Sequence, residues 1–274
     1  ELILPDIAES IKENNEKKSI TTDDIEGIGM GVPGPVKDDG TVLKCVNLGW
    51  GVFNVEKALS VICGGGKVKI ENDANAAALG EYLAGAAKGS KNAVAITLGT
   101  GVGGGIIRGG KIVAGTNGAA GEIGHMPMID DESECCGCGK KGCLEQYASA
   151  NGLVNVAEKY IAAHRTVETE LDLNAGFTAK DVCDAAKAGD KAGLAAVEES
   201  MRLLGKAMAS VSCVIDPQVF VVGGGLSKAG NIIIDTASKY YKEYAFHASR
   251  ETEIKLATLG NAAGMYGGVK MVIG

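Results

Sequence analysis

Short apolar segments that run into glycines recur three times in this chain, at residues 25–34, 93–105 and 219–225. Glycine lets the backbone turn sharply or approach a ligand closely. Helical periodicity is expected over residues 2–17, 54–62, 74–85, 149–164, 178–187, 191–214 and 228–244. Short strands that alternate with long helices predict an α/β fold with a largely parallel sheet. The recurrence of the strand-and-glycine pattern indicates two related halves.

Composition limits the function classes. The net charge of −7 provides no basic surface for nucleic acid or for an anionic membrane. We find no apolar run near the ~20 residues that a membrane span needs, and no pattern of a signal peptide. The expected partners are therefore small molecules, and the expected location is the cytoplasm.

Eight cysteines divide into two groups. Four of them crowd into residues 135–143, and the other four stand singly in apolar segments. A secreted disulfide scaffold is shorter and distributes its cysteines among loops. The distribution favours a reducing compartment and one metal cluster over disulfides.

The crowded cysteines suit a zinc site. Cys136, Cys138 and Cys143, with His125 eleven residues before Cys136, provide three thiolates and one imidazole. Zinc prefers such ligands in a closed tetrahedron. Four protein ligands leave no open position, so the predicted role is structural. Two alternatives stay open at this point: Cys135 in place of Cys136, and a cysteine-rich loop without metal.

The glycine turn at residues 99–105 has three interpretations. Gly99, Gly101 and Gly104 fit a dinucleotide fingerprint, with Glu122 roughly where a ribose ligand would stand. That fingerprint must open a helix, whereas residues 106–114 alternate and read as a hairpin. A strand–loop–strand unit still offers backbone N–H groups and the Thr100 hydroxyl to phosphate. We therefore favour phosphate binding over a purely structural turn or a Rossmann site.

Polar residues 71–75 lie between the predicted strand 67–71 and a helix. Asn72 or Asp73 could simply cap that helix. Ligands of open α/β sheets, however, bind at the carboxyl ends of strands. Glu122 and Glu145 flank the cysteine loop, and carboxylates and amides suit sugar hydroxyls.

These motifs together resemble the ROK family (repressors, open reading frames, kinases). The resemblance rests on residues 70–81, 98–105, 121–125 and 136–145, in matching order and spacing. Residues 31–36 and 46–50 are most similar to bacterial ATP-dependent glucokinases.

The resemblance implies an actin-like (ribonuclease H-like) ATPase fold of two lobes with sugar in the cleft between them. Residues 1–85, completed by a C-terminal helix at 261–274, would form the small lobe. Residues 86–260, with the zinc loop 125–145, would form the large lobe. A homodimer or homotetramer is also implied.

Roles follow position by position from the same resemblance. Asp73 would be the general base that takes the proton from the 6-hydroxyl of glucose. Sugar ligands would be Gly34, Asn47, Asn72, Glu122, His125 and Glu145. ATP, with Mg²⁺, would meet Gly99, Thr100, Gly101, Gly103, Gly104, Gly223, Gly224 and Gly225. The structural Zn²⁺ would keep His125, Cys136, Cys138 and Cys143, with the second ring nitrogen of His125 toward the sugar.

One part of the family pattern is not found. Family members open with a strand and an Asp-x-Gly-Gly-Thr phosphate loop, which this sequence does not show. About 40–50 residues are expected to precede it by comparison, so this chain is expected to bind sugar but to phosphorylate poorly. The alternatives are a kinase for N-acetylmannosamine, fructose, mannose or allose, with polyphosphate as a possible donor, or a sugar-sensing transcriptional regulator.

Overall fold

The computed structural model describes residues 2–43, 45 and 48–274. The helices are α1 (Ile3–Lys18), α2 (Val55–Ile62), α3 (Asp73–Ala84), α4 (Glu145–Ala148), α5 (Ala150–Ala163), α6 (Ala179–Lys187), α7 (Lys191–Ile215), α8 (Asn231–Tyr244) and α9 (Ala263–Ile273). The strands are β1 (Ile28–Val32), β2 (Thr41–Val42), β3 (Phe53–Asn54), β4 (Val68–Asn72), β5 (Asn92–Leu98), β6 (Val102–Arg108), β7 (Lys111–Ile112), β8 (Val219–Gly223) and β9 (Glu253–Leu256).

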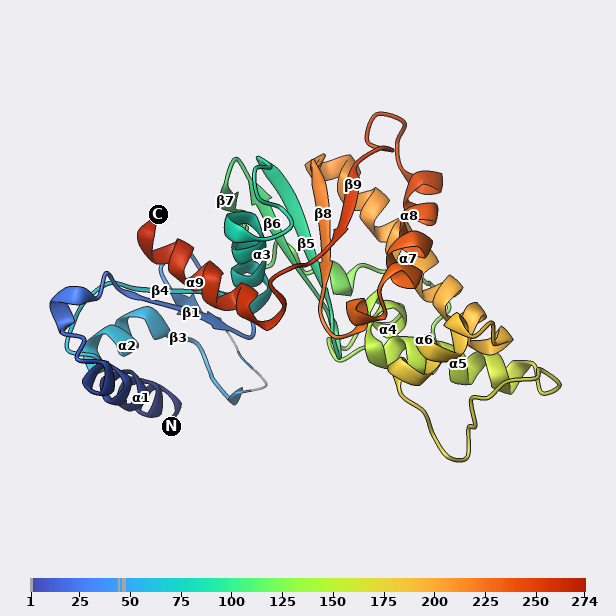
Figure 1. Cartoon of the computed structure of the whole chain (residues 1–274), viewed down its shortest axis with the longest axis horizontal. Coiled ribbons are helices and arrows are strands. Elements are labelled where there is room, and N and C mark those ends of the chain that lie inside the picture. The colour runs from blue at the N-terminus through green and yellow to red at the C-terminus, as the bar shows by residue number, and fades with distance from the viewer. Residues whose placement is uncertain (1, 44, 46–47) are drawn as a thin grey trace.

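A five-stranded sheet in the order β7-β6-β5-β8-β9 organises the larger part of the molecule (Figure 1). β5, β8 and β9 are parallel, and β6 and β7 form an antiparallel edge. Along β5, Val94 and Ile96 face the core beneath α5–α8, while Ala93 and Ala95 face α3. Because successive strand residues point to opposite faces, helices cover both faces of this sheet.

The smaller part contains two short sheets. β1 and β4 are parallel, with Ile28 opposite Val68, and β2 pairs with β3. Its core gathers buried side chains from these strands and from α1 and α2, among them Val32, Leu59 and Ile70. Asn54 starts α2 by accepting a hydrogen bond from the amide of Lys57 at 2.7 Å.

Helices α3 and α9 lie side by side between the two parts (Figure 1). Their contact is made by small residues. A Cβ on Gly80 would stand 1.9 Å from the Ala263 carbonyl oxygen, and a Cβ on Gly267 would stand 1.8 Å from that of Ala76. The two backbones therefore approach as closely as helices can.

The sequence-based elements agree with the structure within a few residues, with one instructive exception. The glycine turn was expected over residues 99–105, but β6 begins at Val102, so Gly103, Gly104 and Gly105 are in a strand. A Cβ on Gly105 would stand 2.5 Å from the Ala78 Cβ. Gly103 and Gly105 let α3 approach the sheet, whereas Gly104 lies against Gly121 and Ile123 on the other face.

Other differences concern the directions and number of the strands and the division into lobes. The sheet is mixed, because β6 and β7 run antiparallel, and β9 was not among the predicted strands. The division into lobes at residue 85 stays a prediction, and α3 packs against both parts. Within the described chain, we find no helix with both the length and the apolar character to cross a membrane.

Candidate functional site

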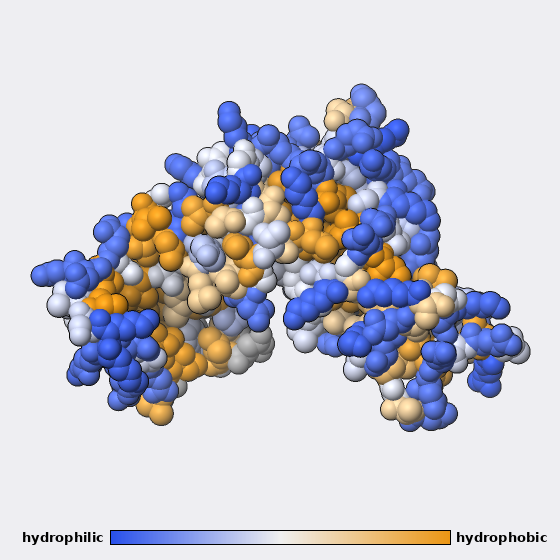
Figure 2. Space-filling view, viewed as in Figure 1, coloured by the Kyte–Doolittle hydropathy of each residue, from blue (hydrophilic) through white to orange (hydrophobic). Residues whose placement is uncertain are grey.

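A cleft of about 770 Å³ lies between the two parts of the molecule. Figure 2 shows the corresponding notch in the surface. The cleft is lined by residues 33–35, 72–74 and 99–104 and by Cys45, Ala77, Thr97, Glu122, His125, Glu145 and Gly224. Most of the side chains that the sequence singled out therefore meet in one place.

The junction of β4 and α3 brings two polar residues to the cleft. The Asn72 side-chain oxygen caps α3 by accepting from the amides of Ala74, at 2.9 Å, and Asn75, at 3.1 Å. The Asn72 side-chain Nδ2 donates to the Gly34 carbonyl oxygen at 3.2 Å. The capping interpretation thus holds for Asn72, which keeps one side-chain N–H for a ligand.

Asp73 is the first residue of α3 and presents its carboxylate to the cleft. One of its oxygens accepts from the amide of Ala74 at 2.8 Å. Partial desolvation in the cleft raises the pKa of Asp73 above its ordinary value of 3.8, and this outweighs the hydrogen bond. A carboxylate with a raised pKa is a better proton acceptor than an ordinary aspartate.

Glu71 makes hydrogen bonds to this junction of β4 and α3. It accepts from the amide of Asn72 at 2.9 Å and from the side chain of Asn75 at 3.1 Å. Burial raises the pKa of Glu71. Asn75 is 2% exposed, and its side-chain oxygen has no hydrogen-bond partner among the residues that the structure describes.

The glycine turn between β5 and β6 forms the opposite wall. The Gly99 amide donates to the Gly101 carbonyl oxygen at 2.9 Å, which closes a tight turn at Thr100. A Cβ on Gly101 would stand 2.1 Å from a carboxylate oxygen of Glu145. Gly101 therefore has to be a glycine for Glu145 to approach this turn.

Glu145 joins the glycine turn to the cysteine loop. Its Oε2 accepts from the Val102 amide at 3.0 Å, and its Oε1 lies 3.6 Å from the Cys136 sulfur. The amide of Ala150, just after α4, also donates to the Gly99 carbonyl oxygen at 2.8 Å. These contacts fix the glycine turn relative to the cysteine loop and to the start of α5.

His125 lies at the boundary between the cleft and the cysteine loop. It ends a 3₁₀ turn over Ile123–His125. Its Nδ1 lies 3.7 Å from the Cys136 sulfur, and its Nε2 lies 3.9 Å from a carboxylate oxygen of Glu122. One ring nitrogen thus faces the sulfur atoms, and the other faces the cleft.

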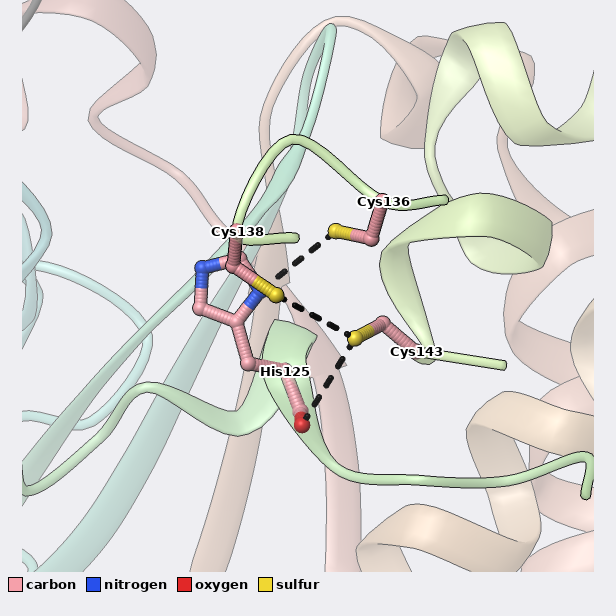
Figure 3. A group of neighbouring side chains, drawn as sticks. All are labelled: His125, Cys136, Cys138 and Cys143. Atoms are coloured by element: carbon pink, nitrogen blue, oxygen red, sulfur yellow. Dashed lines mark hydrogen bonds between the residues drawn. The ribbon is translucent and has the colours of Figure 1, made fainter. Parts of the chain in front are cut away.

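The four predicted zinc ligands gather in a single cluster (Figure 3). The ligand atoms of His125, Cys136, Cys138 and Cys143 all lie within 4.8 Å of one another. The sulfurs of Cys138 and Cys143 are 3.6 Å apart. A tetrahedral zinc with bonds of ~2.3 Å separates two sulfurs by roughly 3.8 Å, so the arrangement fits the ion.

The structure also decides between the alternatives left by spacing. Cys135 is exposed and does not join the cluster, so Cys136 is the better ligand. All eight cysteines are free thiols. Burial raises the pKa of Cys143 to about 12, so a metal must displace its proton on binding.

Some predicted residues do not reach the cleft as expected. Gly103 and Gly104 line it from strand β6, and not from the turn. Of the glycines at the end of β8, Gly224 lines the cleft, whereas Gly223 and Gly225 do not. Asn47 lies outside the described residues.

Two of the cleft-lining residues that the sequence analysis did not predict show a common pattern. Thr97 lines the cleft beside the last residue of β5, and Pro33 lines it just after β1. Both follow the rule that ligand sites form at the carboxyl ends of strands in open α/β sheets.

A family model and several known proteins match this chain. Residues 2–274 match the model of the ROK family. A glucokinase of Halalkalibacterium halodurans is 40% identical over 97% of this chain and 82% of that protein. An N-acetyl-D-glucosamine kinase of Vibrio atlanticus is 33% identical over 97% of this chain and 86% of that protein.

Solved structures agree on the fold. A ROK family glucokinase from Streptomyces griseus, in complex with glucose and AMPPNP, superposes with a TM-score of 0.78 at 34% identity, over 97% of this chain and 87% of that one. A ROK family transcriptional regulator, a homologue of the E. coli MLC protein, gives 0.86 at 26% identity, over 99% and 68%. The chain belongs to the ROK family and has the actin-like fold of its sugar kinases.

Proposed function

We propose that this protein transfers the terminal phosphoryl group of ATP to the 6-hydroxyl of glucose. The observation that carries the proposal is the meeting of Asp73 with Glu122, His125 and Glu145 and with the glycine turn in one cleft. A hexose needs many hydrogen-bonding partners, and a phosphate needs backbone N–H groups. The cleft supplies both.

Asp73 is the proposed general base. It accepts the proton of the attacking hydroxyl, and its raised pKa favours that step. The α3 N-terminus positions the carboxylate, since Asn72 caps the helix and ties it to Gly34. ATP bound with Mg²⁺ would supply the phosphoryl group and the neutralising charge. Gly99, Thr100 and Gly101 would contact the phosphates, and Gly224 would lie by the adenosine.

The sugar-binding side chains come from three segments. Glu122 and the Nε2 of His125 face the cleft together. Glu145 has an oxygen committed to the Val102 amide, and it retains acceptor capacity for a hydroxyl. Asn72 adds its remaining N–H. Gly34 lines the same wall, and Asn47 remains part of the proposal on the family resemblance alone.

The cysteine cluster has a structural role in this proposal. Zn²⁺ would be held by His125, Cys136, Cys138 and Cys143, and it would fix the loop that carries the His125 ring. We expect a chelator to loosen this loop and to weaken glucose affinity in isothermal titration calorimetry. Absence of zinc in metal analysis, or unchanged affinity after chelation, would remove this link.

The choice of glucose rests on the similarity to glucokinases, including the complex with glucose and AMPPNP. The similarity to an N-acetyl-D-glucosamine kinase keeps other hexoses as candidates. A sugar-sensing regulator is the second candidate, because the similarity to a transcriptional regulator extends over 99% of this chain. The two candidates differ in whether Asp73 performs chemistry.

The test combines a substrate panel with one substitution. Glucose, mannose, fructose, allose, N-acetylmannosamine and N-acetyl-D-glucosamine are offered with ATP or polyphosphate, and phosphorylation is followed by ADP or phosphosugar release. Asp73→Asn should keep glucose binding and lower kcat by at least about 10²-fold. Asp39→Asn, an exposed aspartate outside the cleft that also accepts from a backbone amide, is the matched control.

Each outcome points to one candidate. Glucose turnover that depends on Asp73 supports the kinase. Binding of sugar without turnover favours the regulator only when it is found in a protein that carries the family's Asp-x-Gly-Gly-Thr phosphate loop. An Asp73→Asn variant of that protein with unchanged kcat removes the proposed base. Sedimentation of the same preparation tests the expected homodimer or homotetramer.

A further inference from the structure

Glu81 is a buried carboxylate in the last turn of α3, at the other end of this helix from Asp73. It is 3% exposed. Its Oε2 accepts from the Ala86 amide at 2.7 Å, and its Oε1 accepts from the amides of Thr258, at 3.0 Å, and Leu259, at 2.8 Å. The Thr258 hydroxyl also lies within 3.4 Å of Oε2.

These three amides belong to two different connections. Ala86 lies between α3 and β5, and Thr258 and Leu259 lie between β9 and α9. Both connections join the five-stranded sheet to the α3–α9 pair. In Figure 1 the segment that leads from β9 to α9 runs beside α3. Glu81 thus holds together two connections about 170 residues apart in sequence.

The position of the Glu81 carboxylate is unfavourable in free energy. A negative charge in the last turn of a helix opposes the helix dipole, and a buried charge is unfavourable unless hydrogen bonds satisfy it. Gly85 is also forced to be a glycine, because a Cβ there would stand 2.0 Å from the Glu81 carboxylate. A side chain needed only to fill space would avoid all three constraints.

Many of the other contacts of α3 are made by small residues, beside Leu79, which shares a buried cluster with residues of the sheet. Ala76 and Gly80 meet Ala263 and Gly267 of α9. On the opposite face, Ala78 meets Gly105 of β6. Small residues bring backbones close but do not interlock, and packed helices that lack interlocking move by small shear displacements. The hydrogen bonds of Glu81 add directional contacts to this packing.

A small displacement at this end of α3 matters at the other. Asp73 and Glu81 are eight residues apart on one helix, or about 12 Å along its axis. A tilt of about 5° around Glu81 moves Asp73 by about 1 Å over that length. A misplacement of that size can cost about 10²-fold in rate.

We infer that Glu81 is a positioning residue that fixes α3 relative to the five-stranded sheet and so aligns Asp73 with the glycine turn. This inference rests on the proposed function for its kinetic part, whereas its structural part stands on the hydrogen bonds alone. Removal of the carboxylate should lower kcat/KM without removing any group that touches the substrate.

The experiment compares three variants with the wild-type protein. Glu81→Ala removes all acceptors, and Glu81→Gln keeps the oxygen that serves Thr258 and Leu259. Asp190→Asn is the matched control, because Asp190 also holds the amides of two segments, Gly193 at 2.9 Å and Glu170 at 2.9 Å, but within the large part of the molecule. The measurements are kcat/KM for the phosphorylated hexose, thermal melting, and hydrogen exchange of the backbone amides.

The expected pattern separates positioning from stability. Glu81→Ala should lower kcat/KM by about 10²-fold, mostly through kcat, and Glu81→Gln by less. Exchange at Thr258 and Leu259 should accelerate in Glu81→Ala. Asp190→Asn should lower the melting temperature and leave kcat/KM unchanged. A Glu81→Ala protein that melts early but keeps wild-type kcat/KM overturns the inference.

The experiment still tests the role of Glu81 if no hexose is phosphorylated. In that case the proposed function fails, and hydrogen exchange in the ligand-free protein decides the role of Glu81. Faster exchange at Ala86, Thr258 and Leu259 in Glu81→Gln or Glu81→Ala, but not in Asp190→Asn, supports the structural part of the inference. Unchanged exchange in both Glu81 variants overturns it.

Discussion

Replacement of Gly101 by alanine tests the link between the glycine turn and the sugar pocket. The added Cβ would stand 2.1 Å from the Glu145 Oε2 and 3.0 Å from its Cδ. Ordinary contact begins at 3.4 Å, so the carboxylate must retreat by more than about 1 Å, which breaks a normal hydrogen bond. Gly101 does not have a positive φ, so alanine adds no backbone strain.

The size of the effect follows from the bonds that Glu145 makes. A hydrogen bond to a charged group contributes about 1.5–3 kcal/mol, and about 1.4 kcal/mol corresponds to a tenfold change in affinity. We therefore expect Gly101→Ala to weaken glucose binding by about 10- to 150-fold, measured by calorimetry without nucleotide. The control Gly264→Ala places the same methyl group in open space outside the cleft. A folded Gly101→Ala protein with wild-type glucose affinity would refute the role of Glu145 as a sugar ligand.

Three further predictions concern carboxylates whose pKa values are shifted. Because the pKa of Asp73 lies above 3.8 and a base must be unprotonated, kcat/KM should fall as the pH drops through a midpoint above 3.8; a midpoint at or below 3.8 contradicts this. Burial raises the pKa of Glu71 in the folded protein above its ordinary value of 4.5. The protonated form of Glu71 therefore stabilises the fold below pH 4.5, and this contribution is lost as the pH rises through the folded-state pKa. Glu71→Gln should therefore melt higher than the wild-type protein at pH 7, with the difference closing in acid, and a lower melting temperature at pH 7 would count against the argument. Hydrogen bonds, led by that of Tyr147, hold the pKa of Glu132 at about 2, a contribution present above pH 4.5 and lost as the pH falls toward 2. Tyr147→Phe should lower the free energy of unfolding by about 1.5–3 kcal/mol at pH 7, and denaturant titrations at pH 7 and pH 3 should show the effect shrinking in acid.

The cluster of His125 with the three cysteines could be predicted because its determinants are local. Three of the four ligands lie within eight residues, and thiolates and imidazole are diagnostic donors. The choice between Cys135 and Cys136 could not be made from spacing, because the two are adjacent. The structure decides it through the turn in which the Cys136 amide donates to the Lys140 carbonyl oxygen at 2.7 Å.

Contacts between distant segments were beyond the reach of the sequence. Gly103 and Gly105 resemble turn residues, and only the approach of α3 shows why a strand contains them. Glu81 reads as an ordinary surface residue of a helix, since its partners lie 177 and 178 residues later. Asn72 was a candidate cap and a candidate ligand, and the structure shows the cap with one donor left over.

The pairing of α3 with α9 has a consequence for how the protein is made. The two helices are separated by about 180 residues. At a synthesis rate of roughly 5–20 residues per second, α3 leaves the ribosome on the order of 10–40 s before α9. During that interval the alanine and glycine face of α3 and the neighbouring face of β1 lack their cover. The part of the molecule that carries Asp73 therefore completes its folding late, and until α9 arrives these faces stay accessible to other chains and to chaperones.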